Sequence, residues 1–251
     1  MSIERFYIAT QGNDDAAYRE AMQFACGLAN KDPEIKKVIL LAVTQRTTGW
    51  LDRIFGDKIV KQLFTGRTFE NCKPVFKIET IKTYKDCSTP SEIVITLGLD
   101  EEHLFKVDDY YSVKAIIAIP WLMENIQKWV QTWNPKELRG KKDDIKPFPN
   151  PTCIVIKALE ELTETINLSS GFSHPSDENR VKTTILTLHK YEAELNSDIV
   201  ASYLIRELGW ESDLANKIMQ LINTLNTGKS FRGGDRKGLQ HNYKRWKEQC
   251  K

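Results

Sequence analysis

Val38-Ile39-Leu40-Leu41-Ala42-Val43-Thr44 is the stretch that decides the fold, because it is apolar except for its last residue. A short apolar run without polar alternation is typical of a strand that is covered on both faces. Two later runs, residues 93–99 (IVITLGL) and 113–119 (VKAIIAI), have the same character. We therefore expect these runs to form the centre of a mostly parallel sheet with helices on both faces.

Amphipathic stretches separate the apolar runs, as the long crossovers between parallel strands require. Residues 14–30 carry apolar side chains at the spacing of one helix face, and residues 50–64 and 122–133 are also predicted to be helical. A first strand is expected over residues 6–10, and an exposed or edge strand over residues 75–83. This order of elements predicts a Rossmann-like α/β domain.

A stretch rich in proline and charge ends the alternation. Residues 136–151 have no hydrophobic period and are predicted to be a linker. The linker separates the α/β domain, residues 1–135, from residues 152–251, where apolar side chains recur only at helical spacing. The second half is therefore predicted to be an all-α domain with a basic tail.

The composition is that of a globular protein, with 41% hydrophobic and 28% charged residues among 251. No apolar run approaches the roughly 18 residues of a membrane helix, and the first residues do not have the pattern of a signal peptide. We expect a cytoplasmic protein with no membrane partner. The five cysteines have no C-x-x-C spacing, so we expect free thiols rather than disulfides or a zinc site.

The predicted strand ends place polar residues at one edge of the sheet, where ligands of open α/β sheets bind. Arg46 is the cation of this set, and hydroxyl and amide groups dominate the rest, which favours a small polar ligand such as a nucleotide. In the alternative, Gly12 and Asn13 form only a tight turn and Asp14 caps the next helix. One glycine stands where a dinucleotide fingerprint needs three, so no cofactor is predicted. The predicted ligand-binding residues are Thr10, Gln11, Gly12, Asn13, Arg46, Thr47, Gly98 and Asp100.

The tail from Lys229 to Lys251 holds eight Lys or Arg against two acidic residues, which gives it a charge of +6 and leaves −4 on the rest of the chain. Aromatic residues lie between these cations, so phosphates and bases of RNA or DNA would both find partners there. In the alternative, Leu239, Tyr243 and Trp246 pack on the helical domain and the cations are merely solvated. The predicted nucleic-acid-binding residues are Lys229, Arg232, Arg236, Lys237, Lys244, Arg245 and Trp246.

Catalytic candidates are sparse. Arg236 and His241 have an R-x4-H spacing that resembles the ribonuclease motif of HEPN domains, but Lys237 and the nearby glycines depart from that family's pattern, and the family is not assigned. His174, Asp177 and His189 are spaced too loosely to predict a metal site.

These observations predict a nucleotide-like small-molecule binding or sensing protein whose sheet is coupled to a helical, nucleic-acid-binding domain. As a layout, this resembles CRISPR-associated sensors that join a nucleotide-binding sheet to a helical effector. Two alternatives belong to other classes. One is a nuclease or other phosphoester hydrolase that uses either Arg236 and His241 or the set of His174, Asp177 and His189, and the other is a purely structural interaction protein.

Overall fold

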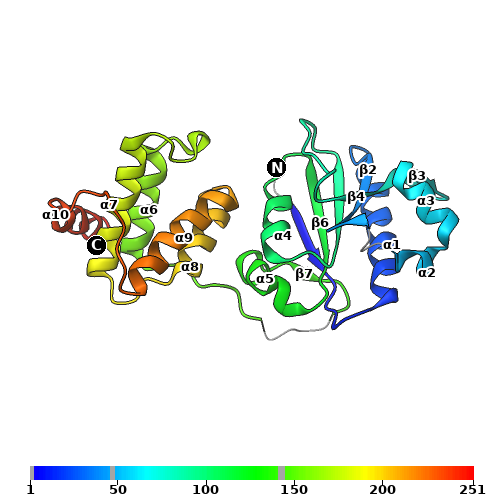
Figure 1. Ribbon diagram of the computed structural model, residues 1–251, viewed down its shortest axis with the longest axis horizontal. Coiled ribbons are helices and arrows are strands. Elements are labelled where there is room, and N and C mark those ends of the chain that lie inside the picture. The colour runs from blue at the N-terminus through cyan, green and yellow to red at the C-terminus, as the bar shows by residue number, and fades with distance from the viewer. Residues whose placement is uncertain (1–2, 46–48, 141–144) are drawn as a thin grey trace. The chain divides into compact units, whose positions relative to one another are not determined.

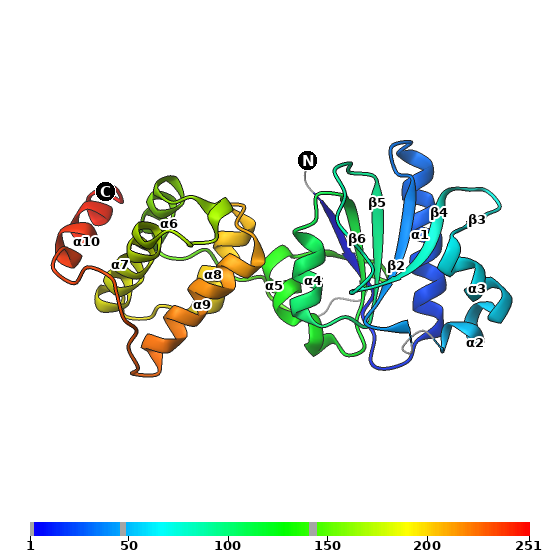
Figure 2. The same cartoon turned by 45° about the horizontal axis from the view of Figure 1, so that its top comes forward.

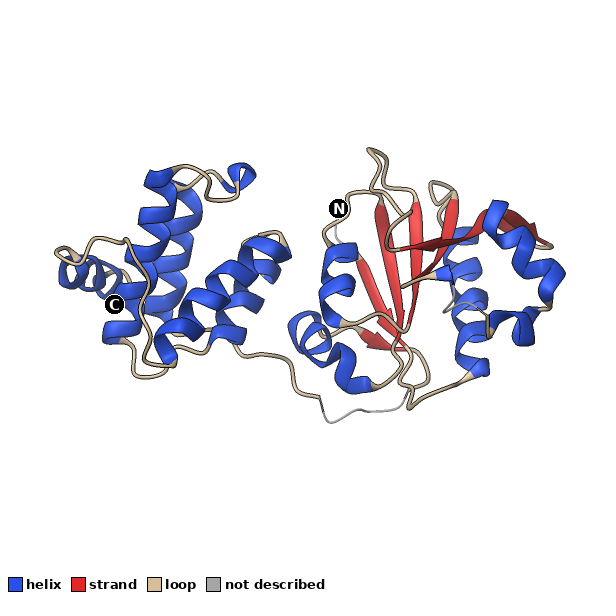
Figure 3. Cartoon of the chain, in the orientation of Figure 1, coloured by secondary structure: helices blue, strands red, loops and turns tan. Residues whose placement is uncertain are grey.

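The computed structural model describes residues 3–45, 49–140 and 145–251, and the chain divides into two compact units, Met1–Pro147 and Phe148–Lys251 (Figure 1). The first unit holds a sheet and its helices, and the described residues of the second form only helices and loops (Figure 3). The division between the units falls within the predicted linker.

The first unit is built on a seven-stranded sheet with the order β3-β4-β2-β5-β6-β1-β7. Every neighbouring pair is parallel except β3 and β4, which are antiparallel. The predicted α/β domain with a mostly parallel sheet is thus confirmed. The strands are β1 (Glu4–Tyr7), β2 (Lys37–Ala42), β3 (Arg67–Phe69), β4 (Cys72–Thr80), β5 (Glu92–Leu97), β6 (Val113–Ile119) and β7 (Lys136–Glu137).

Helices cover both faces of the sheet (Figure 2). Because successive side chains of a strand point to opposite faces, Leu40 packs into one core and Ile39 and Leu41 into the other. The core around Leu40 also contains side chains of α1, α2 and α3, and the other contains side chains of α4, η2 and α5. The helices are α1 (Asp15–Lys31), α2 (Leu51–Phe55), α3 (Asp57–Thr65), α4 (Glu101–Asp108), the 3₁₀ helix η2 (Met123–Ile126) and α5 (Gln127–Trp133).

The sheet differs from the sequence expectation in three places. The strand expected at an edge, β4, lies between β2 and the short β3, which the sequence pattern did not reveal. The helix expected over residues 50–64 is divided into α2 and α3 at Gly56, whose φ is +84°. The α/β unit extends beyond residue 135, because β7 pairs with β1.

The strand order also differs from that of the dinucleotide-binding fold, in which the first strand lies in the middle of the sheet. Here β1 lies between β6 and β7. The chain reaches β2 by passing β6 and β5, then runs outward to β4 and returns to β5 beside β2.

The second unit is helical, as predicted, and its helices bury apolar stripes such as Val155, Leu159 and Leu162 of α6. The amide of Asn196 caps α8 by accepting from the backbone N–H groups of Asp198 and Ile199. The elements are α6 (Cys153–Thr165), the 3₁₀ helix η3 (Leu168–Ser170), α7 (Pro175–Tyr191), α8 (Ser197–Arg206), α9 (Ser212–Asn226) and α10 (Leu239–Glu248).

Two disulfides correct the expectation of free thiols. Cys26 of α1 is bonded to Cys72 of β4, and Cys153 at the start of α6 is bonded to Cys250 after α10. Their partners are 46 and 97 positions apart, so only the folded chain brings the Cα atoms to 5.5 and 5.9 Å. Cys87 is a free, exposed thiol. Within the described residues, no helix has the length and apolar character needed to cross a membrane.

Candidate functional site

The topology makes the carboxyl ends of the strands a candidate ligand site. After β2 the chain continues to α2 on one face, whereas after the neighbouring β5 it continues to α4 on the other. Such a reversal, in which neighbouring strands lead to helices on opposite faces, also occurs between β6 and β1. The chain continues from β6 to η2 and α5, and from β1 to α1. Ligands of open α/β sheets bind outside the carboxyl ends of strands at such reversals. We call the loops that follow β1, β5 and β6 the carboxyl rim.

Backbone hydrogen bonds hold these three loops together. The Gly12 N–H donates to the carbonyl of Trp121 at 2.7 Å, and the Gly98 N–H donates to the carbonyl of Ile119 at 2.8 Å. The buried Thr10 hydroxyl donates to the carbonyl of Pro120. The structure therefore brings Thr10, Gly12 and Gly98 to one place, and the loop after β6 lies between the other two.

Trp121 is the residue of this rim that sequence reasoning missed. Its side chain is 49% exposed, although the backbone on both sides of it is fixed. A β-carbon added at Gly98 would lie 3.9 Å from the Trp121 β-carbon, and the φ of +67° at Gly98 favours glycine. An exposed indole on a fixed backbone is a platform on which a planar ring can stack.

A carboxylate and an imidazole lie on the same rim at the start of α4. Asp100 caps the helix by accepting from the His103 N–H at 3.0 Å, and its Oδ1 lies 2.7 Å from His103 Nδ1. Partial burial opposes ionisation of Asp100, but the hydrogen bonds from His103 outweigh it and hold the pKa of the carboxyl below its usual value.

Asp14 caps α1, which is the alternative that the sequence also allowed, so the N–H groups at the start of this helix are not all open to an anion. The Asp14 carboxylate occupies that position, because it caps the helix by accepting from the Ala17 N–H at 3.1 Å. Asp15 follows it in the first turn and pairs with Arg53 at 2.7 Å, and the Asn13 amide is placed to bond both Asp15 and Arg53. Asp14 and Asp15 are paired with Arg139 and Arg53, so neither arginine is free to bind a phosphate at this end of the rim.

Three other residues were predicted to lie at the rim: Gln11, Arg46 and Thr47. Gln11 is exposed and forms an isolated antiparallel bridge with Leu122. Arg46 and Thr47 lie outside the described residues. The rim as described is therefore polar, with one exposed aromatic side chain and acidic residues at the starts of both α1 and α4.

The carboxy-terminal tail is a folded part of the helical unit. Leu239 and Trp246 of α10 are buried, and the Trp246 indole donates to Glu161 Oε2 at 3.0 Å. Arg245 pairs with the same Glu161, and the Tyr243 hydroxyl donates to Glu192 at 2.9 Å. Trp246 is thus unavailable for stacking on a base, which corrects that part of the prediction, and Arg245 is already engaged.

The other cations that were predicted to bind nucleic acid are on the surface. The loop before α10 is fastened to α7, because the Gly234 N–H donates to Asn179 at 2.9 Å and the Asp235 N–H donates to Thr183 at 2.7 Å. In the described part of the chain these cations form no ion pair, and their side chains are exposed: Lys229, Arg232, Arg236, Lys237 and Lys244. We call these five the basic surface.

The catalytic candidates do not assemble into a site. Arg236 lies in the loop before α10 and His241 in the first turn of that helix, and both are exposed. His174 caps the start of α7, whereas His189 lies in its last turn, roughly 22 Å away along the helix axis at the usual rise per residue. Among the described residues, no group of three or more His, Cys, Asp or Glu is arranged to hold a metal ion.

Comparison with known families adds one match. Residues 151–247, which lie within the helical unit, match a family described as a domain of unknown function, DUF1889. No curated protein and no solved structure matches the chain.

Proposed function

We propose that the α/β unit is a Rossmann-like binding module whose carboxyl rim takes a nucleoside-like ligand, with the planar base stacked on Trp121. The half-exposed indole of Trp121, which stands on a backbone fixed by hydrogen bonds next to β1, carries this proposal. Thr10 is not a ligand contact in it, since its hydroxyl is buried and bonded to Pro120.

The charges of the rim favour the nucleoside over the phosphate of a nucleotide. Asp14 and Asp15 at the start of α1 already hold Arg139 and Arg53, so neither arginine is free for a phosphate, and Asp100 lies at the start of α4. Carboxylates accept hydrogen bonds from sugar hydroxyls and exocyclic amines but repel phosphate oxygens. A ligand with a heterocyclic ring and hydroxyl groups therefore fits the described rim better than a polyphosphate does.

A titration of the full chain with adenosine, guanosine, cytidine and uridine tests this function by calorimetry. We expect at least one nucleoside to bind, and we expect its 5′-monophosphate to bind no more tightly. Trp121→Ala should weaken binding by about fivefold to a hundredfold, because stacking of a base on an aromatic side chain contributes roughly 1–3 kcal/mol.

Tyr111→Ala is the matched control, because Tyr111 is an exposed aromatic residue (65%) at the opposite end of β6. It should leave the affinity unchanged. If no nucleoside binds, or if Trp121→Ala and Tyr111→Ala behave alike, the proposed ligand site is wrong.

The basic surface favours a second function, the binding of single-stranded nucleic acid by the helical unit. Its five cations are exposed and form no ion pair within the described residues, so they are free to replace the counterions of a phosphate backbone. If three or four phosphates are engaged, log affinity should fall with log salt at a slope of about −2 to −3, at roughly −0.7 for each phosphate.

Substitution tests this second function better than truncation, because α10 buries Leu239 and Trp246 in the helical unit. Fluorescence anisotropy with a labelled oligonucleotide should show that Arg232→Gln with Arg236→Gln reduces the slope by about 1.4, the share of two phosphates. Lys157→Gln is the control, because Lys157 of α6 already pairs with Glu160. Equal slopes for the wild type and the double variant would contradict binding through this surface.

A further inference from the structure

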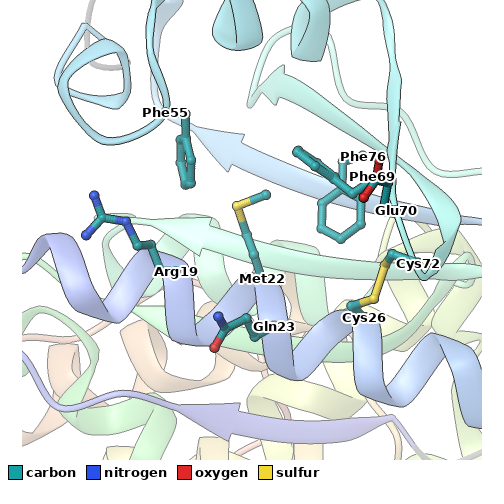
Figure 4. A pocket seen from close by; sticks show the side chains of 9 residues that line it. All are labelled: Arg19, Met22, Gln23, Cys26, Phe55, Phe69, Glu70, Cys72 and Phe76. Atoms are coloured by element: carbon teal, nitrogen blue, oxygen red, sulfur yellow. A yellow bond between two sulfur atoms is a disulfide. The ribbon is translucent and has the colours of Figure 1, made fainter.

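A pocket of about 290 Å³ lies in the α/β unit away from the carboxyl rim, between α1, the end of α2 and the β3–β4 hairpin (Figure 4). Its volume is near the lower end of the roughly 300–1,000 Å³ that is usual for small-molecule sites. The residues that line it are Arg19, Met22, Gln23, Cys26, Phe55, Phe69, Glu70, Cys72 and Phe76.

The floor and walls of the pocket are apolar. Met22 and Phe76 are buried, and the rings of Phe69 and Phe76 meet edge to face with centroids 5.1 Å apart. Figure 4 shows the Met22 thioether rising from α1 between Phe55 and this aromatic pair. The Cys26–Cys72 disulfide completes the wall on the side of the aromatic pair. Such a surface binds an apolar ring or a short branched chain.

The lining of the pocket also contains two charged side chains of opposite sign, Arg19 and Glu70, beside the neutral Gln23. The guanidinium of Arg19 is anchored there, because its Nη2 donates to the carbonyl of Ile54 at 3.3 Å. Figure 4 shows Arg19 and Glu70 on opposite sides of the group of aromatic side chains. A carboxylate is attracted to Arg19 and repelled by Glu70, so an acidic ligand has one favoured orientation.

From this arrangement we propose that the pocket binds a small apolar carboxylic acid, with its carboxylate at Arg19 and its ring or branched chain between Met22, Phe55 and Phe69. The proposal is independent of the carboxyl rim, because none of the residues that line the pocket belongs to the rim. A ligand of this pocket would therefore have both an apolar body and a single negative charge.

Methionine methyl signals locate such a ligand directly. The chain has four methionines, Met1, Met22, Met123 and Met219, and only Met22 lines the pocket. In the full chain labelled with [¹³C-methyl]methionine, 3-phenylpropionate should shift the Met22 signal and leave the others in place. The uncharged analogue 3-phenylpropan-1-ol should shift the same signal but bind about threefold to fivefold more weakly, as expected for loss of an ion pair at an exposed site.

Arg19→Gln should abolish the difference between the acid and the alcohol without weakening the alcohol. Arg53→Gln is the matched control, because Arg53 lies on α2, pairs with Asp15 at 2.7 Å and does not line the pocket. The proposal is overturned if millimolar acid leaves the Met22 signal unmoved. It is also overturned if acid and alcohol bind the wild type equally, or if Arg53→Gln removes the preference as fully as Arg19→Gln does.

Discussion

Arg139 donates two hydrogen bonds to the carboxylate of Asp14, a residue 125 positions earlier in the chain, and the longer of them, from Nη2 to Oδ1, is 3.3 Å. Asp14 caps α1, and Arg139 follows β7, so the pair ties the last strand of the sheet to the start of its first helix. Arg139 also holds Glu20 at 2.7 Å. The pair therefore has a structural role in the α/β unit.

The first prediction is that this ion pair makes the stability of the α/β unit depend on acidic pH. The hydrogen bonds from Arg139 hold the pKa of Asp14 below its usual value, although partial burial acts against them. A carboxyl whose pKa is lowered on folding stabilises the protein above its unfolded pKa of 3.8 and loses that contribution as the pH falls through the folded pKa. Arg139→Gln should cost about 1–2 kcal/mol at pH 7, and less at pH 2.

Urea unfolding of the α/β unit at pH 7 and pH 2 measures both values. Arg53→Gln serves as the control, because it breaks the exposed pair with Asp15 and should destabilise the unit less. A cost of Arg139→Gln that is as large at pH 2 as at pH 7 would show that the Asp14 carboxylate is not the group responsible.

The sequence predicted the central strands of the sheet, but not β7, the short strand that precedes Arg139. The strands β2, β5 and β6 were predicted because each is a mostly apolar run, which is typical of strands buried on both faces. β7 has two residues, Lys136 and Glu137, and forms only because β1 offers an edge to pair with. The position of β1 beside β7 was not predictable either, because periodicity identifies strands but does not order them.

The candidate site was predictable to a similar extent. Gly12 and Gly98 were found because they follow predicted strands, whose carboxyl ends meet in a parallel sheet. Trp121 was missed because an aromatic residue next to an apolar strand resembles a core residue, and its exposure depends on the path of the chain after β6. Trp246 was assigned to the surface among cations, but it lies seven residues after Leu239 on the same helix face and is buried.

A second prediction concerns the ion pair between the half-buried Arg5 and the buried Asp108, whose Nη2 and Oδ1 atoms lie 2.8 Å apart. The Trp129 indole also donates to Asp108, at 3.0 Å. Asp108→Asn leaves the guanidinium of Arg5 without its counter-charge, which should cost about 1.5–3 kcal/mol. The urea midpoint of the α/β unit measures this, with Glu102→Gln at an exposed position of the same helix, α4, as the control. A loss below about 0.5 kcal/mol for Asp108→Asn would contradict the pairing.

A third prediction follows from the two disulfides. Protein denatured without reductant should show one titratable thiol per chain, that of Cys87, and reduction should raise the count to five. Cys87→Ser should remove the single thiol of the unreduced sample and leave four after reduction. Titration with a chromogenic disulfide reagent gives these counts, and five thiols in the unreduced wild type would show that neither bond forms in the purified protein.

The last prediction distinguishes the buried tail from an exposed one. Trp246 is 2% exposed and its indole donates to Glu161, so Trp246→Ala removes a large core side chain and leaves a cavity. The expected cost is about 3–5 kcal/mol, against no more than about 0.5 kcal/mol for the exposed neighbour Lys247→Ala. Hydrogen–deuterium exchange of the full chain localises the effect, because peptides of α6 and α7 should exchange faster while those of β2 and β6 are unchanged. Were Trp246→Ala to leave α6 and α7 protected, α10 would not be part of the helical core.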